Sequence, residues 1–199
     1  MLNFLILTLS TTLLINTDWQ LKKEKHGIEI YTRSVEGSSF HEFKAITTVE
    51  NTSVVQVLDV IFDVDNYESL YADCINPRIL EKEGKYYDIH YVQTKGPLTV
   101  KDRDGVYEQK AEIRKDGKYA IVYIKPLPDY IVVNENMVRI RKGMGYWEME
   151  ETEPGRVKVT YQFHGEPGGE IPAWIANSFV VSHPMGTMKN LKLRLTGKD

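Results

Sequence analysis

The stretch of sequence that decides the fold is Glu166-Pro167-Gly168-Gly169-Glu170-Ile171-Pro172-Ala173-Trp174, at residues 166–174. The adjacent glycines Gly168 and Gly169 can adopt positive φ angles that other residues rarely reach, so the chain can turn tightly here. Pro172 suits the first turn of an α-helix, where its missing N–H group costs no hydrogen bond. The stretch therefore predicts the junction between the last strand of the protein and a C-terminal helix.

Downstream of this junction the hydrophobic residues recur with a helical period. Trp174, Val181, Met185 and Met188 are spaced by 7, 4 and 3 residues, which places them on one face of a helix. We expect this face to be buried, and its methionines suit an adaptable wall better than a tightly packed core. Pro184 lies in the middle of the segment and is expected to kink the helix or break it locally.

Upstream of the junction the pattern is that of β-strands. Val157, Val159, Tyr161 and Phe163 alternate with polar residues without a fault, which is typical of a strand with one buried face. Eight further segments are strand candidates bounded by turn residues, and the last two are expected to pair around Gly143-Met144-Gly145. They are Ile28–Arg33, Phe40–Thr48, Arg78–Glu83, Tyr86–Thr94, Gly105–Arg114, Lys118–Lys125, Met137–Arg141 and Tyr146–Glu151.

A second, shorter helix is expected between the early strands. Thr52 or Ser53 can cap its amino end, and the helix is expected to end around residues 63–66. Its apolar face would be supplied by Val54, Val55, Leu58, Ile61 and Phe62. The whole chain then has the pattern of an α+β fold, in which a curved antiparallel sheet wraps around one long C-terminal helix.

Composition narrows the class of protein. The chain has 199 residues, of which 42% are hydrophobic and 27% charged, with a net charge of -3. These values are typical of one soluble globular domain, and the slightly acidic balance gives no reason to expect nucleic acid as a partner. Cys74 is the single cysteine, so an intrachain disulfide is excluded, and we interpret it as a structural thiol.

The first segment resembles a targeting sequence. Residues 2–15 carry no charged side chain, and the run is too short to span a bilayer but long enough for the apolar region of a signal peptide. We expect a signal peptide at residues 1–17, a mature domain at residues 18–199 and export to the periplasm or the exterior. An uncleaved anchor or a buried N-terminal helix stays open as an alternative.

The sequence offers no catalytic signature. It contains no Gly-x-Ser-x-Gly or His-Glu-x-x-His motif, and its five histidines lack the spacing of metal ligands. We therefore expect no catalytic residue, no metal and no cofactor. Tyr87, His90 and Tyr91 are the group that an enzyme would use to position a substrate.

Four pieces of the sequence, in the same order, resemble the START family of lipid-transfer domains from Asp18 to Leu195. They are Trp19 before Gly27-Ile28, Pro97 followed by Arg103-Asp104, Val138-Arg139, and the Glu166–Trp174 run followed by Asn177. Four positions depart from the family. Glu166 replaces an aspartate, Gly105 replaces an aromatic residue, and His90 and Gln109 stand where some cholesterol-binding members carry an ion pair.

The resemblance implies a helix-grip fold with an internal cavity that binds, and possibly transfers, a lipid or other apolar ligand without chemistry. The partners it implies are that ligand and, transiently, a membrane. The alternative is an enzyme of the wider superfamily, similar to cyclases and aromatases, that acts on an apolar substrate. Arg103 and Asp104 would point to opposite faces of their strand and find separate partners. The residues expected around the ligand are His90, Arg103, Arg139, Trp174, Val181, Met185 and Met188.

Overall fold

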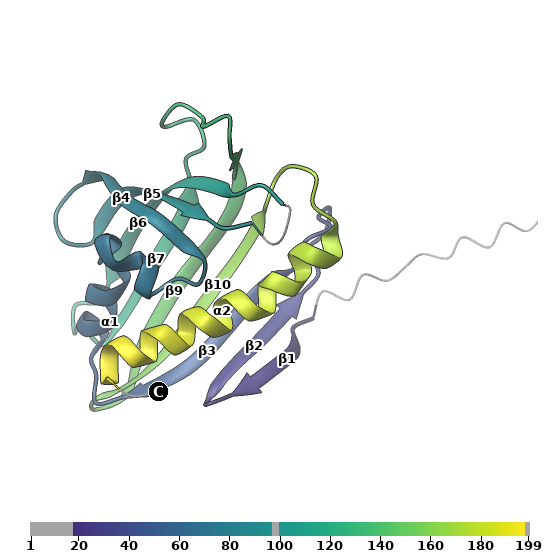
Figure 1. The fold of residues 1–199 in the computed structure, drawn as a ribbon. Helices are drawn as coiled ribbons and strands as arrows, with labels where there is room; N and C mark the ends of the chain where they lie inside the picture. The colour runs from purple at the N-terminus through teal and green to yellow at the C-terminus, as the bar shows by residue number, and fades with distance from the viewer. Residues whose placement is uncertain (1–17, 97–99, 198–199) are drawn as a thin grey trace, which may run out of the picture.

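The computed structural model describes residues 18–96 and 100–197, and these form a ten-stranded curved sheet, two α-helices and a 3-10 helix (Figure 1). The strands are β1 Gln20–Lys25, β2 Ile28–Arg33, β3 Glu42–Glu50, β4 Cys74–Lys82, β5 Tyr87–Thr94, β6 Arg103–Ile113, β7 Tyr119–Pro126, β8 Val138–Arg139, β9 Lys142–Glu153 and β10 Arg156–Glu166. The helices are α1 Val54–Ile61, η1 Val64–Ser69 and α2 Ala173–Thr196. The expected α+β class is confirmed.

The strand order of the sheet is β1-β2-β3-β10-β9-β7-β6-β5-β4, with β8 paired to β6 off this path. β10 therefore joins the first three strands to the rest, because it pairs with β3 on one side and β9 on the other. Thr160 and Phe163 depart from the alternation predicted for β10, because Thr160 is also buried and Phe163 is half-buried, but the prediction is confirmed at Val157, Val159 and Tyr161, which are all buried. These residues belong to the main hydrophobic core.

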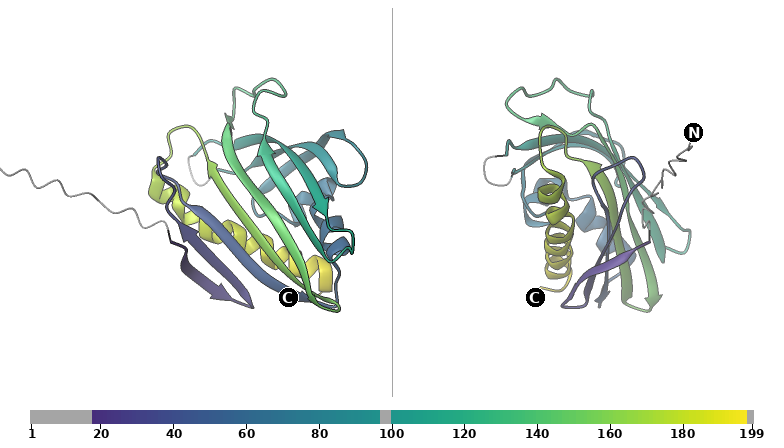
Figure 2. Two further views of the ribbon diagram at one scale, coloured as in Figure 1. Left: turned by 180° about the vertical axis from the view of Figure 1, so that it is seen from behind. Right: turned by 90° about the vertical axis from the view of Figure 1, so that its right-hand side faces the viewer.

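The long helix α2 lies along the concave side of the sheet, and the strands curve around it (Figure 2). It runs from Ala173 to Thr196 without interruption, so the local break expected at Pro184 is not seen. Proline removes one hydrogen bond of the helix. The buried side chains of Pro184, Thr187, Met188 and Leu191 hold the segment in place on the core.

The short helix α1 begins as expected. The Ser53 side chain accepts a hydrogen bond from the Gln56 backbone N–H, and the Gln56 side chain accepts one from the Ser53 backbone, which completes a capping box. Val55, expected on the apolar face, is 42% exposed, and Val57 is buried instead. The helical period explains the difference, because Val57 shares its face with Val54 and Ile61 while Val55 does not.

The expected strand pair around Gly143-Met144-Gly145 is wrong. Both glycines lie inside the continuous strand β9, and β8 pairs in parallel with β6. A side-chain carbon at Gly145 would lie 2.4 Å from a ring carbon of Phe163. The glycines therefore make room for an aromatic ring on the neighbouring strand and do not form a turn.

The edge strand β1 was not expected, and all six of its residues are exposed, so it lacks any alternation to reveal it. The proposed signal peptide at residues 1–17 and Pro97 lie outside the described residues. Among the helices that are described, none combines the length and the apolar character needed to cross a membrane.

Candidate ligand cavity

A cavity of about 270 Å³ lies between the concave face of the sheet and the amino-terminal half of α2. Its walls are largely apolar, and their rings come from η1 and the segment after it, from β3 and the segment before it, from β6 and β10, and from the helix itself. They are Phe40, Phe43, Tyr67, Tyr71, Tyr107, Tyr161, Phe163 and Phe179. A concave, mostly apolar surface with a few polar groups is the usual form of a small-molecule site.

The first part of strand β6, from Arg103 to Gln109, lines the cavity because alternate residues of a strand face the same side. Arg103, Tyr107 and Gln109 all contribute to the lining. Gly105 lies between them, where a side-chain carbon would come within 2.4 Å of the Tyr107 ring, so the glycine lets that ring fold back along the strand. Arg103 and Gln109 are six residues apart, or about 20 Å at the rise of an extended strand.

At the Gln109 end, four polar side chains from η1, β5 and β6 form a buried cluster. The Asp88 carboxylate, 1% exposed, lies 2.7 Å from His90 Nδ1 through one oxygen and accepts from Gln109 Nε2 at 2.8 Å through the other. The same Gln109 Nε2 donates to Tyr67 Oη at 2.8 Å. We name Tyr67, Asp88, His90 and Gln109 the inner polar cluster.

The tyrosines of the cavity are held in their neutral form. Burial raises the pKa of Tyr67 well above its usual value, and burial also raises the pKa of Tyr71, Tyr107 and Tyr161. Tyr67 donates its hydroxyl hydrogen to the carbonyl of Ile61 at 2.7 Å. These phenols therefore serve as walls and hydrogen-bonding groups.

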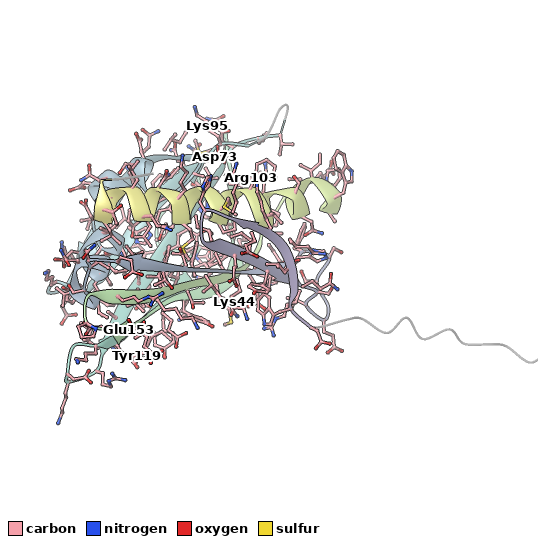
Figure 3. The ribbon with its side chains drawn as sticks, turned by 90° about the horizontal axis from the view of Figure 1, so that it is seen from below. Lys44, Asp73, Lys95, Arg103, Tyr119 and Glu153 are labelled. Carbon is pink, nitrogen blue, oxygen red and sulfur yellow. The ribbon has the colours of Figure 1, made fainter. Side chains whose placement is uncertain are left out.

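At the other end the cavity opens between charged residues. Asp73 and Lys95 are exposed lining residues joined through their backbones, since the Lys95 N–H donates to the Asp73 carbonyl at 3.1 Å. Figure 3 shows Asp73, Lys95 and Arg103 on the same side of α2. Arg103 donates to the carbonyls of Lys101 and Gly168, so it ties the junction loop to β6. The rim thus carries charges of both signs.

Arg139 lies behind the cavity wall. It forms a bidentate salt bridge with Asp104, in which Nε donates to Oδ1 and Nη2 donates to Oδ2, both at 2.9 Å. The pair is almost fully buried. Arg139 also donates to the carbonyl of Pro128 at 2.6 Å. The expectation that Arg103 and Asp104 take separate partners is confirmed. The Asp104–Arg139 pair fastens β8 and the loop before it to β6.

Of the seven residues expected around the ligand, the structure places two, His90 and Arg103, in the cavity lining. Val181 and Met185 are half-buried against the core, and Met188 is fully buried in it. The expectation that Trp174 is buried is wrong, because its side chain is 74% exposed. Trp174 lies in the first turn of α2, which is outside the hydrophobic core that contains Met188. Direct ligand contact by the seven residues stays a prediction.

The helix instead lines the cavity with Asn177 and with a different stripe, Ala176, Phe179, Val180 and His183. Their spacing of 3, 1 and 3 residues is itself helical. This period can be read from the sequence, but the predicted cavity face was based on Trp174, Met185 and Met188 instead. His183 contacts the segment before β4, and burial lowers its pKa despite the opposing effects of Asp73 and the Ala72 backbone.

The groups among the described residues of the site that could bind a metal or act as a nucleophile determine its chemistry. In residues 18–96 and 100–197, no three His, Cys, Asp or Glu side chains gather as metal ligands would. Cys74 is a free, buried thiol that lines the cavity, and burial raises its pKa to about 12. A thiol with so high a pKa is not a nucleophile at neutral pH, which fits a structural role.

Comparison with known proteins agrees with this architecture. The model of the START domain family matches residues 10–195. An uncharacterized protein of Pseudomonas aeruginosa, PA1579, is 33% identical over 88% of this chain and 85% of its own, and mouse phosphatidylcholine transfer protein is 26% identical over 82% and 77%. A STAR-related lipid transfer protein fragment from Xanthomonas axonopodis has a TM-score of 0.80 and 34% identity, covering 87% and 96% of the two chains. Fold, cavity and sequence together show that this chain belongs to the START family.

Proposed function

We propose that the protein binds a lipid in this cavity and carries it between membranes without altering it. The observation behind the proposal is the aromatic cavity beneath the amino-terminal half of α2, with polar groups at its two ends. The lipid transfer proteins among its relatives give independent support. A cavity of this kind can hold an elongated apolar molecule and shield it from water.

A displacement assay tests this proposal. A fluorescent fatty acid bound to the purified protein should be displaced by a lipid extract of the native host. Phe179→Glu places a carboxylate on the cavity wall, where its burial beside an apolar ligand is costly, and binding should be lost. Ser182→Glu makes a similar charge change at an exposed position of the same helix and should bind like the parent. Equal binding by both folded variants would argue against this cavity as the site.

Transfer also requires contact with a membrane, and Trp174 is the candidate contact residue. It is 74% exposed in the first turn of α2, close in sequence to the cavity-lining residues Ile171 and Ala176. Tryptophan favours the interface between lipid and water because its ring is apolar and its N–H group is polar. Trp174→Ala should slow transfer between vesicles more than it weakens ligand binding in solution.

We propose in addition that the protein is exported and that its mature form begins near residues 17–19. The uncharged run at residues 2–15 supports this. The intact mass of the protein from its native host tests it. A chain that retains Met1 and fractionates with the cytosol would contradict export.

The alternative function is an enzyme that acts on an apolar substrate, and one contact favours it. His90 Nδ1 lies 2.7 Å from Asp88 within the inner polar cluster, an arrangement that can orient an imidazole for acid–base work. The ligand recovered from the native protein distinguishes the two functions. A carrier returns the lipid chemically unchanged, whereas an enzyme would also release a modified product.

A further inference from the structure

A second hollow lies on the convex face of the sheet, on the side away from the ligand cavity. On β5 the cavity is lined by His90 and Val92, whereas the second hollow is lined by Tyr91 and Gln93. Because successive residues of a strand point to opposite faces, the sheet itself separates the two spaces. The second hollow has a volume of about 500 Å³. We name it the outer groove: β4, β5 and β6 form its floor, and the segment between β7 and β8 forms its wall with Ile131, Val132 and Asn134.

The wall of the outer groove is fixed at both ends. At one end the Tyr130 hydroxyl donates a hydrogen bond to Glu81 of β4 at 2.5 Å. At the other end the bidentate salt bridge between Arg139 and Asp104 holds the segment against β6. Arg139 also donates to the backbone carbonyl of Ile131 at 3.3 Å. The outer groove therefore has a defined shape in the folded protein.

The polar side chains on the floor satisfy one another. Asn76 Nδ2 donates to Gln93 Oε1 at 2.8 Å, and Gln93 Nε2 donates to Tyr91 Oη at 3.0 Å. The Tyr91 hydroxyl in turn donates to Asp104 Oδ2 at 3.3 Å. Each end of the Gln93 amide thus has one partner, so the floor presents its groups in a fixed arrangement.

Arg78 is a charged side chain of the groove that these contacts do not use. It is exposed, and its guanidinium carbon lies 4.6 Å from the centre of the Tyr91 ring, a cation–π contact that holds the group in place. Within residues 18–96 and 100–197, the Arg78 side chain makes no ion pair and donates no hydrogen bond. Its N–H groups are therefore available for a bidentate contact with an anion.

The charges of the outer groove indicate which anion fits. Asp104 and Arg139 balance each other, so Arg78 contributes one unbalanced positive charge. A carboxylate carries one negative charge and matches it, whereas a phosphate monoester carries about 1.5 to 2 at neutral pH. The excess would face Asp104 and the nearby carboxylates of Glu68 and Glu81, which lie outside the lining. The groove therefore favours a single carboxylate.

The wall adds an apolar surface to this site. Val132 is 93% exposed, and Ile131 lies beside it in the chain and also lines the groove. An apolar chain of a few carbon atoms laid against these two side chains would remove their surface from water. The lining thus suits a ligand that combines one carboxylate with a short apolar chain.

We propose that the outer groove is a second binding site, and that its ligand is a small monocarboxylic acid with a short apolar chain. The carboxylate contacts the guanidinium of Arg78, and the chain lies against Ile131 and Val132. The site lies on the face of the sheet opposite the lipid cavity, so it does not depend on the proposed function.

Titration of the unaltered protein followed by ¹H–¹⁵N NMR tests this with 4-methylpentanoate, 4-methylpentanamide and 3-methylbutyl phosphate, which share one alkyl group. The side-chain amides of Asn76, Gln93 and Asn134 should shift when the acid is added. The acid should bind about fivefold more tightly than the amide, the upper range for an exposed ion pair, and the phosphate should bind more weakly than the acid. Equal binding of acid and amide, tightest binding of the phosphate, or shifts confined to the lipid cavity would overturn the proposal.

The carboxyl terminus of a partner protein carries the same chemistry as a free acid. A fourth probe, the peptide N-acetyl-Gly-Gly-Leu with a free carboxylate, distinguishes the two sources. Binding no tighter than that of 4-methylpentanoate supports the free acid. Clearly tighter binding of the peptide would overturn the small acid as the ligand in favour of a chain end.

Two variants locate the site. Arg78→Gln removes the charge from an exposed side chain, so the fold should persist and the preference for the acid over the amide should disappear. Arg114→Gln removes another exposed arginine that lies over a tyrosine, with its guanidinium carbon 5.6 Å from the centre of the Tyr119 ring, and should leave the preference unchanged. Equal losses in both variants would show that surface charge in general attracts the acid, and would overturn the site. Displacement of lipid from the cavity would survive that result, so the two proposals fail separately.

Discussion

The two halves of α2 differ in what holds them. All four of its buried residues, Pro184, Thr187, Met188 and Leu191, lie in the carboxyl-terminal half. The amino-terminal half, from Ala173 to His183, is half-buried or exposed and forms one wall of the cavity. A single continuous helix therefore serves as an anchor at one end and as the cover of a binding site at the other.

The contacts outside the hydrophobic core follow the same division. In the carboxyl-terminal half, Asn190 donates to the Leu70 carbonyl at 3.2 Å, Lys192 donates to the His26 carbonyl at 3.0 Å, and Arg194 pairs with Asp63. In the amino-terminal half, Asn177 accepts from the His41 N–H at 2.9 Å and donates to the Ser39 carbonyl at 3.2 Å. Opening of the cavity should therefore begin at the amino-terminal half.

The largest expected effect is on the anchor. Met188→Ala should lower the free energy of unfolding by about 2–5 kcal/mol, because it leaves a cavity among residues that cannot fully collapse. Urea unfolding followed by circular dichroism measures this. A loss below about 1 kcal/mol would mean that the anchor tolerates a cavity and that the two halves are more alike than their burial suggests.

Asn177→Ala should destabilise the amino-terminal half of α2, which covers the cavity, and leave the stability of the carboxyl-terminal half unchanged. It removes both hydrogen bonds to the segment before β3, at a cost of about 1–2 kcal/mol. Hydrogen exchange should quicken at residues 174–183 while residues 185–196 keep their protection. Faster exchange along the whole helix would show that α2 opens as one unit and would contradict the division.

The pH dependence of stability should reveal His183. Burial lowers its pKa from the ordinary 6.5, so the unfolded chain binds the proton more readily than the folded chain. Stability is then complete above about pH 6.5 and decreases as the pH falls toward the lowered pKa. His183→Gln should reduce this decrease in urea titrations at a series of pH values. Part should persist, because burial also lowers the pKa of His41.

The smallest expected effect on stability is at Trp174. Since its side chain is 74% exposed, Trp174→Ala should change the free energy of unfolding by no more than about 0.5 kcal/mol. The same measurement used for Met188→Ala checks it. A loss of several kcal/mol would place Trp174 in a packed environment and restore the original expectation that it belongs to the core.

Sequence patterns predicted the parts of the fold in which local chemistry and burial agree. The alternation of Val157, Val159 and Tyr161 marked β10, and Ser53 marked the start of α1, because each signal arises from nearby residues. The turn predicted at Gly143 and Gly145 was wrong, because these glycines make room for the ring of Phe163 on the paired strand β10. Such a contact is set by the tertiary structure and leaves no local pattern.

The site was harder to predict than the fold for the same reason. His90 and Arg103 were expected in the cavity lining, and both line it. The inner polar cluster joins Tyr67 of η1 to Asp88 and Gln109 of two strands, so no spacing along the chain reveals it. The residues of α2 that line the cavity recur with a helical period. Periodicity alone, however, does not predict which face of the helix packs on the sheet and which face lines the cavity.

The order of strands also governs when the protein can fold during synthesis. β3 pairs with β10, so Val49 meets Val157 only after the intervening chain has been made. At about 5–20 residues per second, the ribosome leaves β3 with an unpaired edge for roughly 5–20 s. An unpaired strand edge can pair with a strand of another chain. Correct folding therefore requires β10 to pair with β3 before another chain does. The cavity needs β10 and α2 together, so it can form only after α2 has been synthesised.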